Sequence, residues 1–206
     1  MEIMNQLENL KKIAKTKLAK NDPAHDFEHV MRVYRNAEKI CKTESGNKKL
    51  ILSAVLLHDI IKTKNRKDSS LKSAKLSEKI LKENNFHGDE IKIISNAIKQ
   101  HSFSKGKIPS TIEGKILQDS DRLDAIGAIG LARVFSFSGS NNRPFYDPND
   151  PFSKNRVLND NRWALDHFYE KLLTLEKKMN TKTGKNLAKK RTKILKNFLK
   201  ELKNEI

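Results

Sequence analysis

Apolar residues recur at every third or fourth position along most of the chain, and no stretch sustains a strict alternation of apolar and polar residues. The first pattern is typical of helices that bury one face, whereas the second would indicate strands. Helices are therefore predicted at 2–19, 24–43, 48–62, 70–84, 88–101, 111–136, 157–179 and 183–204. We predict an all-α fold, a single-domain helical bundle that occupies residues 1–206.

One long stretch, residues 137–152, interrupts the helical pattern. It contains three of the five prolines of the chain, and proline breaks a helix because it lacks a backbone N–H and its ring fixes φ. Irregular connections of this length in compact domains are commonly functional. Because four aromatic residues also lie in this stretch, we expect an ordered flap that packs near an active site or an interface.

Several classes of protein are excluded by composition. The longest apolar stretch, residues 50–57, is far shorter than the roughly 20 residues that a membrane-spanning helix needs, so no integral membrane segment is predicted. The single cysteine, Cys41, excludes a disulfide framework and a multi-thiolate zinc site. No secretory signal is predicted at the N-terminus. We therefore expect a cytoplasmic protein, and the sequence leaves room for a homodimer.

The chain carries a formal net charge of +17. Such an excess suits an anionic partner: nucleic acid, an anionic membrane surface or a phosphorylated small molecule. Lysine supplies 33 of the 42 basic residues, and lysine lacks the forked donors with which arginine recognises bases and phosphates, so composition does not choose among them. The basic helix at 183–204 keeps a second class of function open, a protein that binds nucleic acid or a membrane surface.

Candidate metal ligands end or interrupt the apolar helices. His58 and Asp59 lie near the end of the most apolar predicted helix, where a carboxylate is costly to bury unless a cation or hydrogen-bond donors meet it. His29 lies at the border of the apolar stripe of the helix at 24–43. Three further carboxylates interrupt the apolar helix at 111–136: Asp119, Asp121 and Asp124. Imidazole and carboxylate ligands suit Mn²⁺, Fe²⁺, Co²⁺, Ni²⁺ or Mg²⁺, and the residues alone do not choose among the three aspartates.

The pair His25 and His29 has the spacing of the HExxH helix of zinc proteases. Asp26 stands where that motif has glutamate, and its shorter side chain would reach the attacking water poorly. A protease would also leave His58, Asp59 and the three aspartates without a role. We therefore do not favour a protease.

Taken together, these residues resemble a known family. The order His29, His58-Asp59 and Asp121 looks like the H…HD…D pattern of the HD-domain metal-dependent phosphohydrolases, a superfamily with an all-helical core. The segments that carry the resemblance lie at 25–33, 56–60, 98–103, 112–130 and 143–146. They look most like the small stand-alone bacterial branch of that superfamily.

The resemblance implies that His29, His58, Asp59 and Asp121 bind one divalent metal ion, with Mn²⁺ or Mg²⁺ expected first, and that open positions remain for water and a phosphate oxygen. Asp121 is preferred to Asp119 because it begins an Asp-x-Leu run before the continuing helix, as the last ligand does in the family. Whether one or two ions bind is left open.

The resemblance also suggests residues that act on the substrate. Asp59 and Lys62 are placed in catalysis, since Lys62 completes an HDxxK form in which the lysine lies near the phosphate. Asp124 could orient the attacking water. His101 could contact substrate or a second metal ion, or could simply cap its helix. The candidates for phosphate binding are Arg32, Arg122 and Arg133.

The implied activity is hydrolysis of a phosphorylated small molecule by water that a metal ion activates. Members of the superfamily act on nucleoside monophosphates and triphosphates, cyclic nucleotides and alarmones. We expect pyrophosphohydrolysis of a nucleoside or deoxynucleoside triphosphate, with a nucleoside 5'-monophosphate phosphatase as the alternative. In the predicted flap, Phe145 and Tyr146 could stack on a base.

Overall fold

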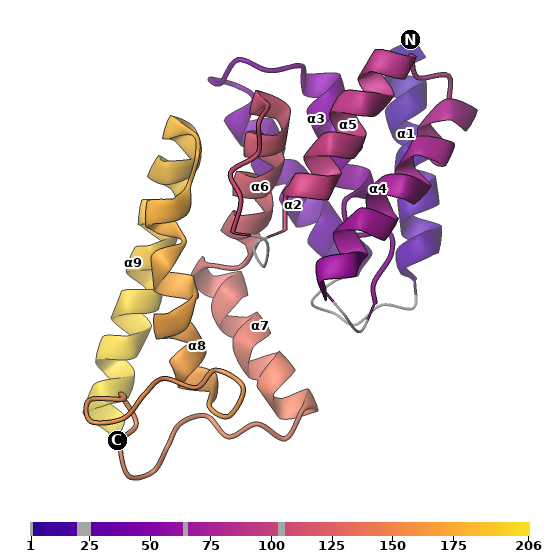
Figure 1. The fold of residues 1–206 in the computed structure, drawn as a ribbon. Helices are drawn as coiled ribbons and strands as arrows, with labels where there is room; N and C mark the ends of the chain where they lie inside the picture. Colours follow the sequence, from indigo (N-terminus) through magenta and orange to yellow (C-terminus); the bar gives the residue numbers. More distant parts are fainter. Residues whose placement is uncertain (1, 20–25, 64–65, 103–105) are drawn as a thin grey trace. The chain divides into compact units, whose positions relative to one another are not determined.

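The computed structural model describes residues 2–19, 26–63, 66–102 and 106–206 (Figure 1). Over these residues the secondary structure is helical and includes no strand, which confirms the predicted all-α fold. Internal contacts divide the chain into two compact units, residues 1–121 and 122–206. That the two units fold as one domain stays a prediction.

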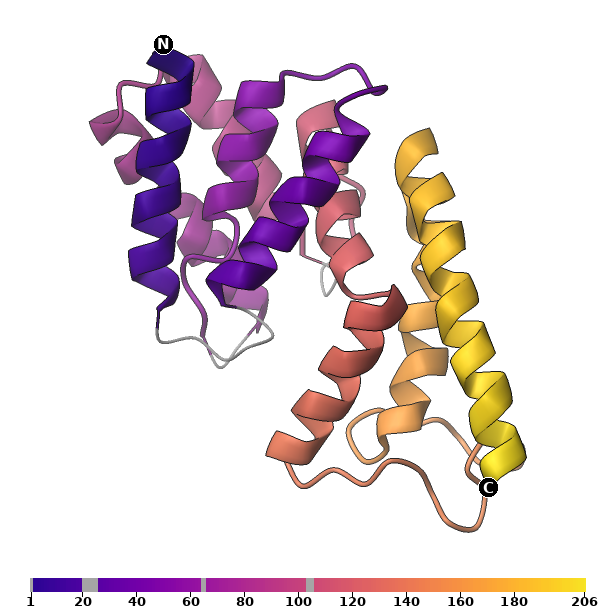
Figure 2. The ribbon, with the colours of Figure 1, turned by 180° about the vertical axis from the view of Figure 1, so that it is seen from behind.

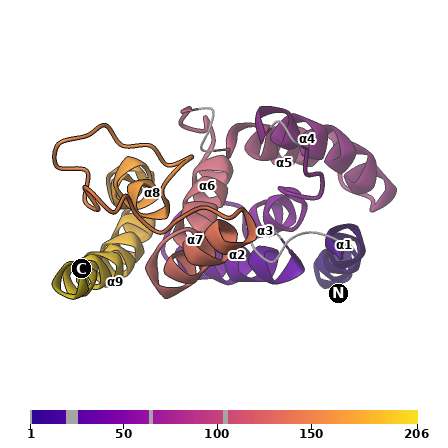
Figure 3. The same ribbon diagram turned by 90° about the horizontal axis from the view of Figure 1, so that it is seen from below.

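The unit 1–121 is built around one helix that is buried over most of its length. Its helices are α1 (Glu2–Leu18), α2 (Phe27–Ile40), α3 (Lys48–Leu57), α4 (Arg66–Glu83), α5 (Gly88–Gln100) and the first part of α6 (Ile112–Asp124). Every residue of α3 from Leu50 to Leu57 is buried, and α1, α2 and α5 pack against it (Figure 2). Helix α4 packs along α5 (Figure 3). The apolar run at 50–57 is therefore the core of this unit.

Helix α2 begins at a capped residue. The Asp26 carboxylate accepts a hydrogen bond of 2.9 Å from the backbone N–H of His29, as an N-cap side chain does. This cap fixes His29 in the first turn of α2, on the buried face that continues through Val30 and Val33. Residues 24 and 25, which include the first histidine of the protease-like pair, lie outside the described residues.

The sequence predicts that the third helix continues to residue 62, but α3 ends at Leu57. Hydroxyl groups of α4 hold the chain beyond it: the N–H of Ile61 donates to Ser73 Oγ, and the N–H of Thr63 donates to Ser69 Oγ. His58 therefore stands at the C-cap of α3, and Asp59 lies in the turn that follows.

The prediction of one continuous helix at 111–136 is wrong, because α6 ends at Asp124 and a separate helix, α7 (Gly127–Ser140), begins after Ile126. Gly127 adopts a φ of +80°, a left-handed conformation that favours glycine. At Gly130, an added Cβ atom would lie 2.2 Å from the carbonyl oxygen of Ala125, so only glycine fits. Two glycines thus permit an interruption of the helix that helical periodicity alone does not reveal.

The unit 122–206 contains α7, α8 (Ala164–Glu170), two short 3₁₀ turns (Leu172–Thr174 and Glu176–Lys178) and α9 (Lys182–Glu205). The prediction of a single helix at 157–179 is wrong, because within this range only α8 is an α-helix. The basic helix predicted at 183–204 is confirmed as α9. Phe135, Phe168 and Phe198, one from each helix, pack with ring centroids 5.7–6.0 Å apart and form the aromatic core of this unit.

The irregular stretch runs over 141–163 rather than 137–152, since α7 continues to Ser140. It is held by two arginine side chains. Arg156 donates to both carboxylate oxygens of Asp166, at 2.6 and 2.8 Å. Arg143 donates to Ser138 Oγ and to the carbonyl oxygen of Asp160. These contacts give the segment a defined conformation, and that it packs near an active site or an interface stays a prediction. Among the described residues, no helix combines the length and apolar character needed to cross a membrane.

Candidate metal centre

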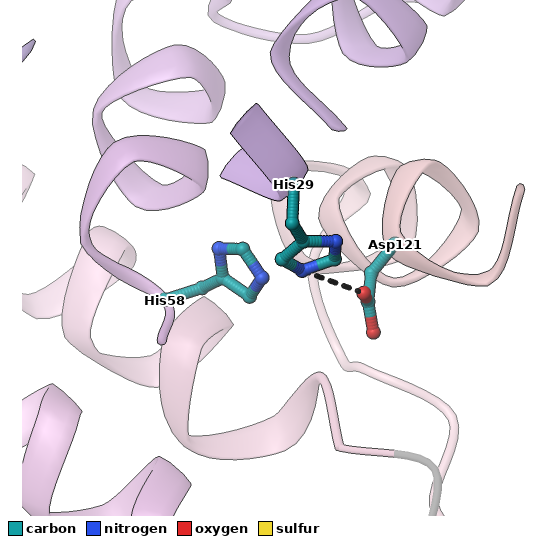
Figure 4. A group of neighbouring side chains, drawn as sticks. All are labelled: His29, His58 and Asp121. Atoms are coloured by element: carbon teal, nitrogen blue, oxygen red, sulfur yellow. Dashed lines mark ion pairs between the residues drawn. The ribbon is translucent and has the colours of Figure 1, made fainter. Parts of the chain in front are cut away.

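Five ionisable side chains meet within the unit 1–121. They come from α2, the end of α3, the end of α5 and α6: His29, His58, Asp59, His101 and Asp121. Figure 4 shows three of them. His29 Nε2 lies 3.6 Å from Asp121 Oδ1 and 3.9 Å from Asp59 Oδ2. Asp59 Oδ2 lies 3.8 Å from His58 Nε2, and Asp59 Oδ1 lies 3.7 Å from His101 Nε2. The four residues predicted as ligands thus lie together, with His101 beside them.

The imidazoles and the carboxylates of this cluster differ in burial. The side chains of His29, His58 and His101 are at most 5% exposed, whereas those of Asp59 and Asp121 are 26% and 29% exposed. The histidines therefore form the buried side of the cluster, and the carboxylates reach solvent. A substrate could approach from the side of the carboxylates.

Backbone carbonyl groups fix two of the imidazole rings. His58 Nδ1 lies 2.7 Å from the Val55 carbonyl oxygen, and His101 Nδ1 lies 2.6 Å from that of Ile98. Since a carbonyl oxygen only accepts, each Nδ1 carries a proton, and in the neutral imidazole, the form that binds metal, each Nε2 presents a lone pair. In both residues that lone pair faces a carboxylate. His58 Nε2 is buried and has no hydrogen-bond partner among the described residues.

A divalent cation satisfies this arrangement of acceptors. Two ligand atoms that each lie about 2.1 Å from one ion are roughly 3–4 Å apart, and the imidazole–carboxylate separations of 3.6–3.9 Å match that range. A set of nitrogen and oxygen ligands without thiolate suits Mn²⁺, Fe²⁺, Co²⁺, Ni²⁺ or Mg²⁺. The cluster fits a metal ion on its donor chemistry and on its unsatisfied buried nitrogen.

The surroundings also set the charge of these ligands. Burial lowers the pKa of His58, which keeps the imidazole neutral, the form that binds metal. Burial raises the pKa of Asp59, but His58 and His101 outweigh that effect and hold the pKa well below its usual range. For His101, burial lowers the pKa and the Asp59 carboxylate raises it by more. Asp59 is therefore an anion at neutral pH.

Two buried amides position the cluster, and sequence reasoning missed both. The Gln118 amide donates to the carbonyl oxygens of His101, at 3.2 Å, and Lys107, at 3.0 Å. The Asn36 amide donates at 3.1 Å to the carbonyl oxygen of Ser120, next to Asp121. Both residues interrupt apolar helix faces at positions within two turns of a candidate ligand, and that polar interruption was the available signal.

The other candidates in this unit differ in whether they join the ligand cluster and in how far they are buried. Asp121 joins the cluster, whereas Asp119 is fully buried and belongs to neither group of candidate metal ligands among the described residues. Arg32 lies half-buried on α2, one turn after His29, and Lys62 is exposed in the segment after α3. The roles of Arg32 and Lys62 in binding phosphate stay predictions.

The remaining candidates lie in the unit 122–206, where they contact one another or the backbone. Arg133 donates at 2.7 Å to the buried carboxylate of Asp124. Arg122 donates to the carbonyl oxygen of Lys178. These contacts give each of the three side chains a structural partner, and their action on water or phosphate stays a prediction.

A helical unit that gathers imidazoles and carboxylates is typical of a metal-dependent hydrolase. Comparisons with known proteins agree. A family model described as HD domain matches residues 26–126. YpgQ of Bacillus subtilis is 32% identical over 213 residues, which cover 100% of this chain and 96% of YpgQ.

Solved structures give the same result. The crystal structure of Bacillus subtilis YpgQ in complex with ADP has a TM-score of 0.80 at 29% identity, covering 100% of this chain and 97% of the other. An HD-superfamily hydrolase from Bacillus thuringiensis has a TM-score of 0.79 at 32% identity, covering 98% and 97%. The chain belongs to the HD-domain family. Together with the match to an HD-superfamily hydrolase, this supports a metal-dependent phosphohydrolase.

Proposed function

We propose that this chain hydrolyses a nucleoside or deoxynucleoside triphosphate to the nucleoside monophosphate and pyrophosphate. Water adds to the α-phosphorus, the anhydride bond between the α- and β-phosphates breaks, and pyrophosphate leaves. His29, His58, Asp59 and Asp121 would hold one divalent cation, Mn²⁺ or Mg²⁺ being the first to test. When bound, such a cation withdraws charge from a phosphoryl oxygen and lowers the pKa of water.

The observation that carries the nucleotide assignment is the complex of YpgQ with ADP, since that structure aligns with the whole of this chain. ADP carries a nucleoside and a phosphoanhydride, the two parts of the proposed substrate. The ligand cluster of this chain supports the hydrolytic part of the proposal, because its carboxylates are the members that reach solvent.

The chain's own residues have distinct tasks in this proposal. Lys62 and Arg32 would neutralise charge on the phosphate oxygens, as cations do in phosphoryl transfer. Asp124 would orient the attacking water, and Arg122 and Arg133 would add positive charge near the phosphates. His101, which stands against Asp59 at 3.7 Å, would hold that carboxylate or contact substrate.

Phosphorus NMR tests the proposal directly. The protein is incubated with nucleoside and deoxynucleoside tri-, di- and monophosphates, with Mn²⁺ or Mg²⁺, and a parallel series contains EDTA. We expect pyrophosphate and monophosphate from triphosphates, no product with EDTA, and no product from Asp121→Ala.

Each other result changes the conclusion. Orthophosphate from 5'-monophosphates would replace the proposal with a nucleoside 5'-monophosphate phosphatase. Metal binding by the wild type, without turnover of any nucleotide, would overturn the nucleotide assignment and leave the metal centre standing. Failure of the wild type to bind a divalent cation would overturn the proposed activity as a whole.

A further inference from the structure

Helix α9 exposes a row of lysines that the metal centre does not use. Seven lysines, all exposed, follow one another at intervals of three or four residues: Lys182, Lys185, Lys189, Lys193, Lys196, Lys200 and Lys203. Side chains at this spacing share one face of a helix. At 1.5 Å per residue, this α9 lysine stripe is about 32 Å long.

A neighbouring face of α9 is already covered by its own unit. Ala188, Leu195 and Leu199 are buried, and α9 packs on α7 and on the two 3₁₀ turns. Within α9, whose residues are all described, Ile194 is the single large apolar side chain that is exposed. A helix that enters a membrane surface needs a free apolar face, whereas the apolar face of α9 is packed against its own unit.

Among the described residues, the lysines of the stripe have no acidic partners. In the part of the chain that the structure describes, no ion pair involves any of the seven. Lysines of the other unit do pair, for example Lys11 with Glu8 and Lys49 with Glu90. Since like charges four residues apart destabilise a helix, the stripe is an arrangement that an anionic partner would stabilise.

The chemistry of the stripe selects among anionic partners. Lysine contacts phosphate as a point charge and does not read base edges as arginine does, so recognition would be independent of sequence. Single strands are usually held by exposed aromatic side chains, but Phe198, the aromatic residue of α9, packs against Phe135 and Phe168. The length of the stripe is close to one turn of a duplex, about 34 Å.

We propose that the α9 lysine stripe binds the phosphate backbone of double-stranded nucleic acid without sequence preference. The surface lies on α9, whereas the cluster of candidate metal ligands lies in the unit 1–121. The inference therefore stands or falls independently of the proposed hydrolysis.

The test uses the full chain and a fluorescently labelled 20-base-pair DNA duplex, with fluorescence anisotropy measured over a series of salt concentrations. Seven phosphate contacts predict that log K falls against log salt with a slope of about −6. The variant K189Q/K193Q/K196Q should flatten the slope by about 3 and weaken binding by roughly two orders of magnitude at 0.1 M salt. Glutamine forms helices about as well as lysine, so α9 should persist.

A matched control separates the stripe from overall charge. K15Q/K72Q/K75Q removes three exposed lysines of the other unit and leaves the same net charge; it should bind the duplex as the wild type does. Circular dichroism checks that both variants keep their helices. An RNA duplex of equal length should bind similarly, because the backbone charge is shared.

Four results would overturn the proposal. The first is absence of duplex binding at about 0.05 M salt, where phosphate contacts are strong. The second is equal weakening of duplex binding by the control variant. The third is tighter binding of the single strand than of the duplex, and the fourth is tighter binding of phosphatidylserine vesicles than of either nucleic acid. The last result would assign the stripe to an anionic membrane surface.

Discussion

His58 Nδ1 lies 2.7 Å from the carbonyl oxygen of Val55, three residues earlier in the chain. The contact belongs to the last turn of α3, the most buried helix of its unit, so the packing of that helix aims the imidazole. The proton on Nδ1 leaves Nε2 as an acceptor. Because a main-chain atom supplies this orientation, it needs no second side chain, and substitutions around the cluster should leave the His58 ring in place.

Removal of the Asp121 carboxylate should abolish metal binding. Asp121→Ala takes away one oxygen ligand 3.6 Å from His29 Nε2, and we expect at least a 100-fold loss of Mn²⁺ affinity, more than outer partners of a ligand usually contribute. Isothermal titration calorimetry measures the affinity. Asp89→Asn, which removes a carboxylate that is 94% exposed, is the matched control and should bind Mn²⁺ normally.

Metal should also raise the stability of the wild type. A ligand that binds the native state alone at 100 times its Kd adds about 2.7 kcal/mol. The melting temperature should therefore rise with Mn²⁺ and return to the metal-free value with EDTA, while that of Asp121→Ala should not respond. A rise in both proteins would place the metal outside the cluster.

Gln118 should affect the centre through His101. Gln118→Leu removes amide donors from the carbonyl oxygens of His101 and Lys107, which should cost about 1–3 kcal/mol of stability and weaken metal binding or turnover. Gln6→Leu is the matched control, because the Gln6 amide likewise donates to two carbonyl oxygens, those of Asn84 and Asn85. Urea unfolding should show similar losses for both variants, and only Gln118→Leu should alter the metal site. Equal effects on activity would count against a positioning role.

Arg133 should be required to keep the Asp124 carboxylate buried. That carboxylate is 2% exposed and lies 2.7 Å from Arg133 Nη1, and loss of one partner from a buried pair typically costs about 3–5 kcal/mol. Arg133→Met should lower the free energy of unfolding by an amount in this range, and Arg133→Met with Asp124→Asn should recover part of it. If Asp124→Asn alone lowers kcat with unchanged stability, Asp124 acts on the attacking water as well.

Glu90 should contribute stability that acid removes. Burial raises the pKa of Glu90, but the Lys49 ammonium at 2.9 Å and the N–H of His87 outweigh it and hold the pKa below 4.5. Because the folded state has the lower pKa, this stability is present above about pH 4.5 and is lost as the pH falls through the folded value. Urea unfolding at pH 7 and pH 3 should show a smaller acid-induced loss for Glu90→Gln than for the wild type. Equal losses would assign acid sensitivity to other carboxylates.

Much of the unit 1–121 could be predicted from the sequence because the pattern of apolar residues within each helix indicates which of its faces is buried. The apolar stripe of α2 and the continuous apolar run of α3 each mark a buried surface, and His29 and His58 stand at the edges of those surfaces. The H…HD…D order then identified His29, His58, Asp59 and Asp121 as ligands of one site, although no local pattern connects these residues. All four ligands inferred from that resemblance lie in the cluster.

The errors arose where tertiary contacts decide the backbone. Helix α3 stops early because Ser69 and Ser73 of α4 take the N–H groups that would have continued it. The interruption after α6 contains the positive φ of Gly127, and in the loop before α8 Arg156 pairs with Asp166 of that helix. Gln118 was missed because a single polar residue on an apolar helix face does not show which carbonyl groups its amide will contact.

The hydrogen bond between the Asn36 amide and the Ser120 carbonyl oxygen spans 84 positions of sequence. Contacts so distant form late when a chain folds, because the loop between them must first close. A chain with only its local helices assembled would therefore have no affinity for the metal, and α2 must already lie beside α6 before the ligands meet. Metal affinity in this protein is therefore a measure of completed folding of the unit 1–121, because the ligands come together only when its helices have packed.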